Sequence, residues 1–246
     1  MSSACVPAAA AAAAAAPAAG KAPEGAREVL TAKAQIKVAR IVSAEPLENS
    51  AKLLRLQADL GGGDTRQGTG WAGHDAAGMM ALPGDRRACV HAAGVRDWQG
   101  AGLAQFMQPA QLVGCLVCVA ANLKPAKLAG QASEAMVLAA EATDSRGQAI
   151  VRTLLPPEGS QPGDLVHLDG ATAPASYPKV LKLDEWRKVV PGLVVAAGGK
   201  VRGAAGTSPA RQACGSGPAT FEGTPLVTSQ GLVTLPQEIP DGSEIH

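Results

Sequence analysis

The stretch from residue 117 to 138 constrains the fold more than any other part of the sequence, because it predicts two strands joined by one rigid turn. An apolar run at 116–121 is typical of a buried strand. The segment 122–125 ends in a proline, which lacks an amide donor and disfavours helical geometry before it. We therefore expect a loop there, a return turn at Gly130 and a second strand over 133–139.

Further strands are predicted on both sides of this stretch. Residues 35–42 alternate apolar and polar side chains, and residues 52–60 do so again, which indicates an antiparallel pair. Residues 148–154 form the last predicted strand, and residues 105–113 indicate a short helical turn region. About five short strands with one small helix and Gly/Pro turns favour an all-β fold, a closed Greek-key barrel of the OB type.

The central stretch resembles the signature of the tRNA-binding domain family, which includes the C-terminal domain of methionyl-tRNA synthetases and the endothelial-monocyte-activating polypeptide II domain. The residues that carry the resemblance are Asn122-Leu123-Lys124-Pro125-Ala126-Lys127-Leu128, Gly130 and Ser133-Glu134-Ala135-Met136. Ala129 stands where the family usually has a basic residue, and Ala135 where it usually has a glycine. The resemblance implies the same OB fold and binding to tRNA.

The resemblance also implies which residues contact RNA. Lys124 and Lys127 are expected to meet phosphates, with solvated turn charges as the alternative. Ser133 and Met136 match positions implicated in tRNA recognition, where a hydroxyl bonds to sugar or phosphate and a thioether packs on a base or ribose. Their alternative is a tight strand start and a core methionine. Asn122 either contacts RNA or caps the loop, and the structural role is favoured.

Two basic residues of the first strands complete the predicted RNA-binding set. Arg40 lies on the first predicted strand and Lys52 on the second, and we expect them to share one face of the barrel with the loop lysines.

The overall charge works against strong attraction to RNA. Lys and Arg number 22 against 21 Asp and Glu, a formal net charge of +1. A neutral barrel is expected to bind RNA weakly and to lose that binding quickly with salt. Aromatic residues make up only 2% of the chain, which excludes a broad platform for base stacking.

The sequence predicts three parts. Residues 1–32 are rich in Ala and Pro and are expected to form a disordered tail. Residues 33–170 are expected to form the barrel, interrupted by a Gly-rich surface insert at 61–85. Residues 171–246, which contain a second insert at 198–218, resemble the β-rich C-terminal subdomain of the polypeptide II class. In that class the subdomain packs on the barrel and mimics a dimer interface, which implies a monomer.

No pattern of an enzyme, cofactor site or metal site is present in the sequence. It lacks a phosphate-binding glycine loop, a nucleophile elbow and a synthetase catalytic motif. Cys115 and Cys118 are three apart on a predicted strand, where they would face opposite sides, so buried thiols are favoured over zinc or redox chemistry. The four histidines have no metal-ligand spacing with the cysteines.

The sequence therefore predicts a tRNA-binding accessory module that supports an aminoacyl-tRNA synthetase. The rival hypothesis is a structural scaffold subunit of a larger assembly that kept the barrel and lost strong RNA affinity. No apolar window reaches the length of a membrane span, so we expect no membrane association. A cytoplasmic location is favoured over an organelle, because the first 32 residues hold one arginine and two glutamates, unlike a transit peptide.

Overall fold

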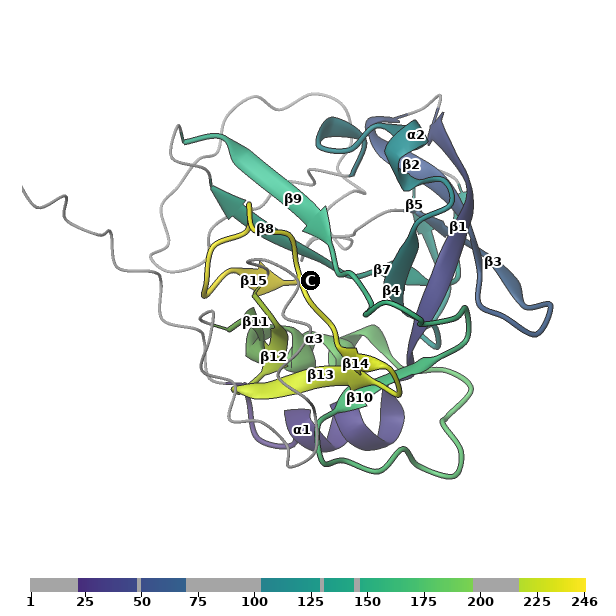
Figure 1. The fold of residues 1–246 in the computed structure, drawn as a ribbon. Helices are drawn as coiled ribbons and strands as arrows, with labels where there is room; N and C mark the ends of the chain where they lie inside the picture. The colour runs from purple at the N-terminus through teal and green to yellow at the C-terminus, as the bar shows by residue number, and fades with distance from the viewer. Residues whose placement is uncertain (1–21, 48–49, 70–102, 129–130, 144–146, 197–216) are drawn as a thin grey trace, which may run out of the picture.

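The structure is a computed structural model that describes residues 22–47, 50–69, 103–128, 131–143, 147–196 and 217–246. Within these residues the chain is mainly antiparallel β-sheet with a few short helices (Figure 1). An OB-type barrel is followed by a β-rich C-terminal subdomain, as the sequence predicted.

Strand β1 (Ile36–Leu47) is the centre of the barrel, because three strands pair with it. They are β2 (Ser50–Asp59), β4 (Leu116–Ala120) and β10 (Leu165–Leu168), all antiparallel. The predicted alternation of β1 is present: Ile36 and Val38 are buried, whereas Lys37 between them is partly exposed. The strands predicted at 35–42, 52–60 and 116–121 are therefore confirmed.

The start of the predicted insert at 61–85 is a barrel strand instead of a surface loop. Strand β3 (Thr65–Thr69) pairs with β2 along its whole length. The turn between them requires Gly61, which has a positive φ of 79° and whose added Cβ would clash with the backbone carbonyl of Pro162. The polar sequence Thr-Arg-Gln-Gly-Thr carries no apolar alternation, so its strand was not visible. Residues 70–102 lie outside the described residues.

The single strand predicted at 133–139 is divided into three, because successive segments follow different partners. Residue Ser133 ends a hairpin, and the chain then turns to the barrel and to the next hairpin. The strands are β5 (Ala126–Leu128) with β6 (Gln131–Ser133), β7 (Met136–Val137) beside β4, and β8 (Ala139–Thr143) with β9 (Ala149–Thr153). The last of these confirms the strand predicted at 148–154.

The C-terminal subdomain continues the barrel sheet. Its strands run in the order β13-β12-β11-β15, with β13 paired to β10 and β15 paired to β8, so they connect two edges of the barrel (Figure 1). Helix α3 (Leu183–Val189) was not predicted, and it packs inward through Trp186. The strands are β11 (Leu193–Val195), β12 (Ala219–Phe221), β13 (Thr224–Thr228), β14 (Gly231–Leu232) and β15 (Glu244–Ile245). The insert predicted at 198–218 lies almost wholly outside the described residues.

The predicted tail extends too far, because residues 22–33 belong to the fold. Helix α1 (Ala26–Glu28) and a π-helical turn (Val29–Lys33) bury Ala26, Val29 and Leu30 in the same core as Trp186. This burial outweighs the polar and Gly/Pro composition that suggested disorder. Residues 1–21 lie outside the described residues.

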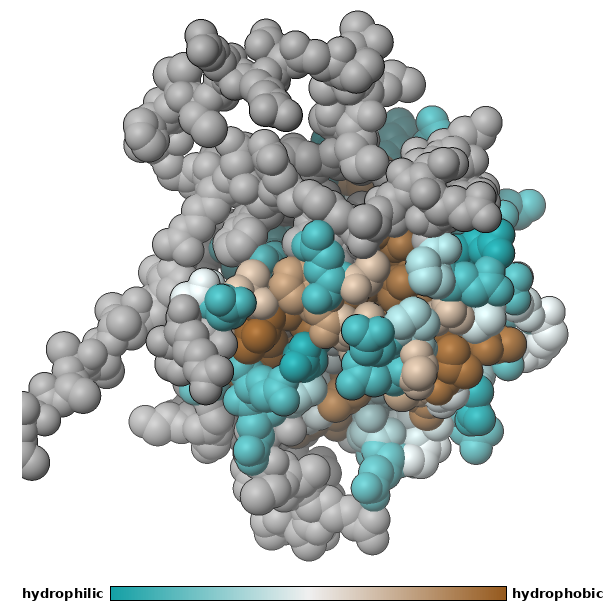
Figure 2. All heavy atoms as spheres, turned by 90° about the horizontal axis from the view of Figure 1, so that it is seen from above, coloured by the Kyte–Doolittle hydropathy of each residue, from teal (hydrophilic) through white to brown (hydrophobic). Residues whose placement is uncertain are grey.

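The described residues form two hydrophobic clusters. One lies under the C-terminal strands and includes the large buried side chains Trp186 and Phe221, and the other fills the barrel below a 3₁₀ turn (Leu103–Gln105) and α2 (Pro109–Leu112). These two turns confirm the helical region predicted at 105–113. On the face seen from above, apolar side chains lie among polar ones (Figure 2). No helix among the described residues is both long enough and apolar enough to span a membrane.

Candidate nucleic-acid interface

The loop that leaves β4 is fixed at its first residue, Asn122. The Asn122 side chain is 4% exposed. Its Oδ1 accepts a hydrogen bond from the Gln35 amide at 2.9 Å, and its Nδ2 donates to the carbonyls of Lys33 at 2.8 Å and Pro178 at 3.0 Å. The amide side chain thus joins its own loop to two other backbone segments, 33–35 and Pro178, and these bonds support the structural role over direct RNA contact.

The loop then runs beside a segment of the C-terminal subdomain. Leu123 and Leu181 form a parallel bridge, in which the Lys124 amide donates to the Leu181 carbonyl at 2.9 Å and the Leu181 amide donates to the Asn122 carbonyl at 2.6 Å. Leu123 and Leu181 are 9% and 1% exposed. Because consecutive residues of an extended chain point to opposite sides, the Lys124 side chain is directed outward, and it is exposed.

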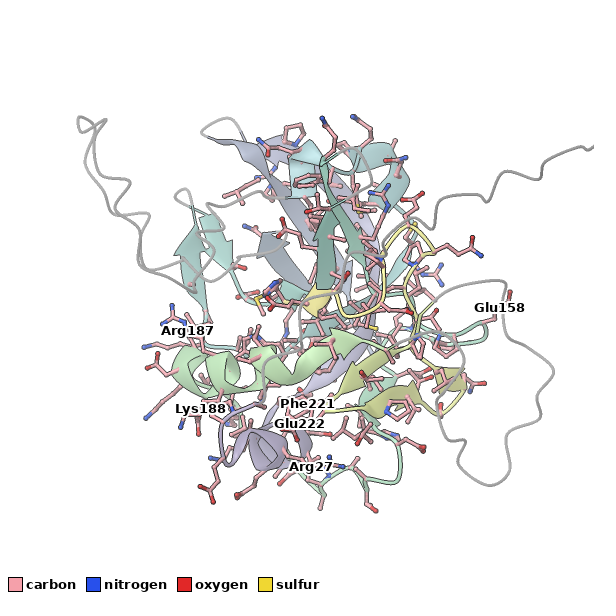
Figure 3. All side chains as sticks on the ribbon, turned by 90° about the vertical axis from the view of Figure 1, so that its left-hand side faces the viewer. Arg27, Glu158, Arg187, Lys188, Phe221 and Glu222 are labelled. Atoms are coloured by element: carbon pink, nitrogen blue, oxygen red, sulfur yellow. The ribbon has the colours of Figure 1, made fainter. Side chains whose placement is uncertain are left out.

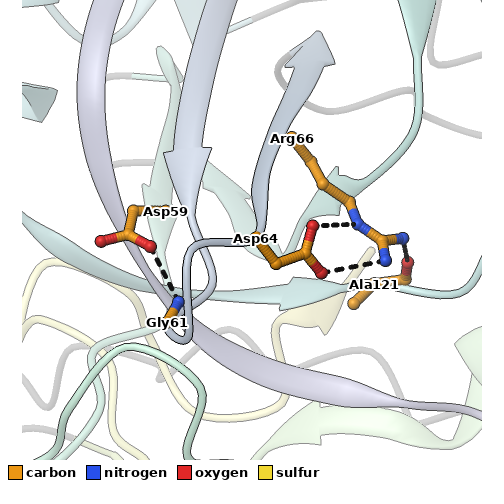
Figure 4. Close-up of polar contacts among 5 residues, drawn as sticks. All are labelled: Asp59, Gly61, Asp64, Arg66 and Ala121. Atoms are coloured by element: carbon orange, nitrogen blue, oxygen red, sulfur yellow. Dashed lines mark hydrogen bonds and ion pairs between the residues drawn. The ribbon is translucent and has the colours of Figure 1, made fainter.

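Arg66 on β3 holds the other side of the same region. Its Nε and one terminal nitrogen donate to the two Asp64 carboxylate oxygens at 3.1 and 3.0 Å, and its other terminal nitrogen donates to the Ala121 carbonyl at 2.7 Å (Figure 4). The hydrogen bond from Arg66 lowers the pKa of Asp64 below its usual value, and the nearby Lys37 lowers it further. These three hydrogen bonds, called the Arg66 fork below, connect the β2–β3 turn to the end of β4.

A shallow groove lies between these elements. It has a volume of about 340 Å³ and combines residues of the barrel with residues of the C-terminal subdomain. Its lining is formed by Asp64, Thr65, Arg66, Leu123, Pro125, Glu134, Lys179 and Val180. The groove therefore has apolar walls at the loop and at Val180, and charged groups of both signs at its rim.

The structure brings only part of the predicted RNA-binding set to this groove. Lys124 is exposed beside it and has no ion-pair partner among the described residues. Arg40 is exposed and lies opposite Asp59 on β2, which in turn pairs with Thr65 at the groove. Lys52 lies seven residues from Asp59 along the same strand. The Lys52 backbone is therefore roughly 20 Å from that end of the strand.

The remaining predicted residues divide between a side chain that is not described and two that have structural contacts. Lys127 lies on β5 opposite Ala132, and the structure does not describe its side chain. The Ser133 hydroxyl is partly exposed and donates to the Ala135 carbonyl at 3.1 Å. Met136 is 9% exposed and packs in the core, which supports the core-methionine alternative.

Sequence analysis missed Arg66 and Lys179 at the groove. Arg66 belongs to the Gly-rich region that was interpreted as an insert, and Lys179 follows Tyr177-Pro178 in a segment with no strand or helix pattern. Neither position carried a sequence signal that linked it to the loop 122–125, because the link is made by tertiary contacts.

The predicted pair of buried cysteines is half correct. Cys118 on β4 is fully buried, and desolvation raises the pKa of its thiol to about 12. Cys115 precedes the strand and is exposed, and its thiol donates to the Gln111 carbonyl at 3.0 Å. Among the described residues, no three His, Cys, Asp or Glu side chains gather in a way that could hold a metal ion.

Comparison with known proteins agrees with this fold and loop. Residues 100–165 match the family described as a putative tRNA binding domain. The C-terminal domain of Plasmodium vivax p43 has a similar fold, with a TM-score of 0.61 at 18% identity over 89% of this chain and 99% of that one.

The curated relatives are much longer than this chain. Methionine–tRNA ligase of Helicobacter pylori is 38% identical over 113 residues, which are 46% of this chain and 13% of that protein. The corresponding protein of Cupriavidus necator is 35% identical over 150 residues, 59% of this chain and 17% of that protein. The chain thus spans about a sixth or less of these relatives.

The β-barrel and its rigid loop define an OB-fold protein with a C-terminal subdomain. The match at residues 100–165, which include the whole loop region, is more specific. Over these residues the chain is similar to the tRNA-binding domain family.

Proposed function

We propose that the chain is a tRNA-binding accessory module that supports an aminoacyl-tRNA synthetase and performs no catalysis itself. The observation that carries this proposal is the loop 122–125. It lies within the family match, its backbone is fixed on both sides, and it presents Lys124 to solvent beside a groove. An ammonium group on a rigid loop can meet an RNA phosphate with little loss of conformational freedom beyond its own side chain.

The chain is proposed to act as a monomer in the cytoplasm, or alternatively in an organelle. The pairing of β13 with β10 and of β15 with β8 supports the monomer, because the subdomain covers two barrel edges that a second copy could otherwise cover.

The second candidate function is a scaffold subunit that has lost strong RNA affinity. The net charge of +1 favours it, as does the distance of Lys52 from the groove along β2. In this case the groove region would contact a protein, and RNA would bind weakly or not at all.

A filter-binding titration with bulk tRNA at several salt concentrations separates the two functions. The comparison is between the native chain, Lys124→Ala/Lys127→Ala and the control Arg187→Ala/Lys188→Ala, whose residues project outward from α3 (Figure 3). If the chain is a tRNA-binding module, Lys124→Ala/Lys127→Ala should bind tRNA more weakly than the native chain. The slope of log affinity against log salt concentration should also become shallower, by about 0.7 to 0.9 for each lost phosphate contact. Absence of binding by the native chain at low salt rules the module out.

A further inference from the structure

The segment 178–182 of the C-terminal subdomain continues the surface of the loop 122–125. The parallel bridge places Leu123 beside Leu181, so Lys124 and Lys182, each one residue further on, are also neighbours. Both leucines are buried and both lysines are exposed. Adjacent extended segments lie about 4.8 Å apart. Two exposed lysines therefore stand on adjacent backbone segments, one from each part of the fold.

Lys179 adds a third cation at the groove. It is exposed and lines the groove together with Arg66 and Val180, and Val180 is 51% exposed. The carbonyl of the preceding residue, Pro178, accepts a hydrogen bond from Asn122. The same side chain that fixes the barrel loop therefore also fixes the backbone beside Lys179.

The nearby carboxylates are mostly neutralised by other cations. Asp64 is bound by the Arg66 fork, and Asp184, two residues from Lys182, forms an ion pair with Arg187 at 3.5 Å. Glu185, which also feels the charge of Lys182, accepts a hydrogen bond from Lys33 at 2.8 Å. Among the described groove residues, Glu134 is then the one acidic group that forms no ion pair. Three lysines then face one carboxylate, a local excess of positive charge on a chain that is nearly neutral overall.

We propose that Lys179 and Lys182 bind RNA backbone phosphates together with Lys124, so that one RNA strand contacts the barrel and the C-terminal subdomain at once. The inference rests on the proposed function and extends it, because it gives the subdomain a direct part in RNA binding. Clustered cations of fixed geometry suit a polyanion, since each neutralised phosphate releases counterions and adds to affinity. The mixed groove between Arg66 and Lys179 lies along the path of that strand.

The test is fluorescence anisotropy of labelled bulk tRNA with the full chain, measured from low to moderate salt. The variants are Lys124→Ala, Lys179→Ala/Lys182→Ala and the control Arg27→Ala/Lys188→Ala, which removes the same charge from two exposed positions away from the groove (Figure 3). We expect the Lys179/Lys182 pair to weaken binding about tenfold at moderate salt and to lower the log–log salt slope by about 1.5. The control is expected to stay within about twofold of the native chain, and Lys179→Arg/Lys182→Arg to retain binding.

The outcomes distinguish this inference from the proposed function. If Lys124→Ala weakens binding but the Lys179/Lys182 pair behaves like the control, the subdomain has no part in binding and the accessory function stands. Equal losses in the pair and in the control indicate diffuse attraction and also overturn the inference. If the native chain does not bind tRNA at all, both fail.

Discussion

Glu141 and Glu244 lie directly opposite each other on the antiparallel strands β8 and β15. Glu141 is 7% exposed, and its two carboxylate oxygens have no hydrogen-bond partner among the described residues. Desolvation, with the added repulsion of Glu244, raises the pKa of Glu141 to about 7. This buried carboxyl therefore sits where the C-terminal strand closes on the barrel.

The first prediction is that Glu141→Gln stabilises the chain above pH 7. The pKa of Glu141 is higher in the folded than in the unfolded state, so the folded state holds its proton more tightly. The contribution of the protonated Glu141 to the free energy of unfolding is fully present below about pH 4.5 and is lost as the pH rises to about 7. We expect Glu141→Gln to gain up to about 3 kcal/mol in free energy of unfolding at pH 8 and little at pH 4.5, as measured by urea denaturation. The exposed Glu24→Gln serves as the control, and an equal gain at both pH values would contradict the prediction.

Asn122→Ala is expected to destabilise the fold by about 2–4 kcal/mol. The substitution leaves the Gln35 amide and the carbonyls of Lys33 and Pro178 without the side chain that bonds them in a buried site. Asn122→Asp keeps the acceptor for Gln35 but loses both donors, so it too is expected to destabilise. Denaturant unfolding measures both. A loss of RNA affinity in Asn122→Ala without any loss of stability would instead show that Asn122 contacts RNA directly.

Arg66→Lys is expected to cost about 1–2 kcal/mol although it keeps the charge, because an ammonium group cannot span both Asp64 oxygens and the Ala121 carbonyl. The matched control is Arg55→Lys, whose partner Glu45 is 54% exposed, and it is expected to change stability by less than about 0.5 kcal/mol. Thermal unfolding of both variants compares them. Similar small effects would mean that the fork does not stabilise the β2–β3 turn.

Ile245→Ala is expected to cost about 2–5 kcal/mol, because Ile245 is fully buried where β15 pairs with β8. Leu232→Ala removes a similar side chain from a position that is 39% exposed and is expected to cost less than about 1 kcal/mol. The two are compared by urea denaturation. If Ile245→Ala were as mild as Leu232→Ala, the C-terminal strand would contribute little to the barrel.

Local patterns predicted the elements that depend on local physics. Alternation located β1 and β2, an apolar run located β4, and Pro125 located the loop that follows. The same patterns missed β3, whose side chains are polar, and α3, which lies in a segment interpreted as β-rich. They also placed residues 22–32 in a disordered tail, because their burial depends on partners such as Trp186 that lie more than 150 residues away.

The sequence by itself determined the barrel strands β1, β2, β4 and β9, the rigid loop and the resemblance to a tRNA-binding domain, since these follow from spacing, proline geometry and residue identity. Only the tertiary structure decided which basic residues lie near one another around the groove. It placed Lys52 at the far end of β2 from the groove, buried Met136, and joined Asn122 to Pro178 across 56 residues of chain. The physical reason is that backbone hydrogen bonds between distant segments carry no local sequence pattern, yet they set the position of every side chain beside them.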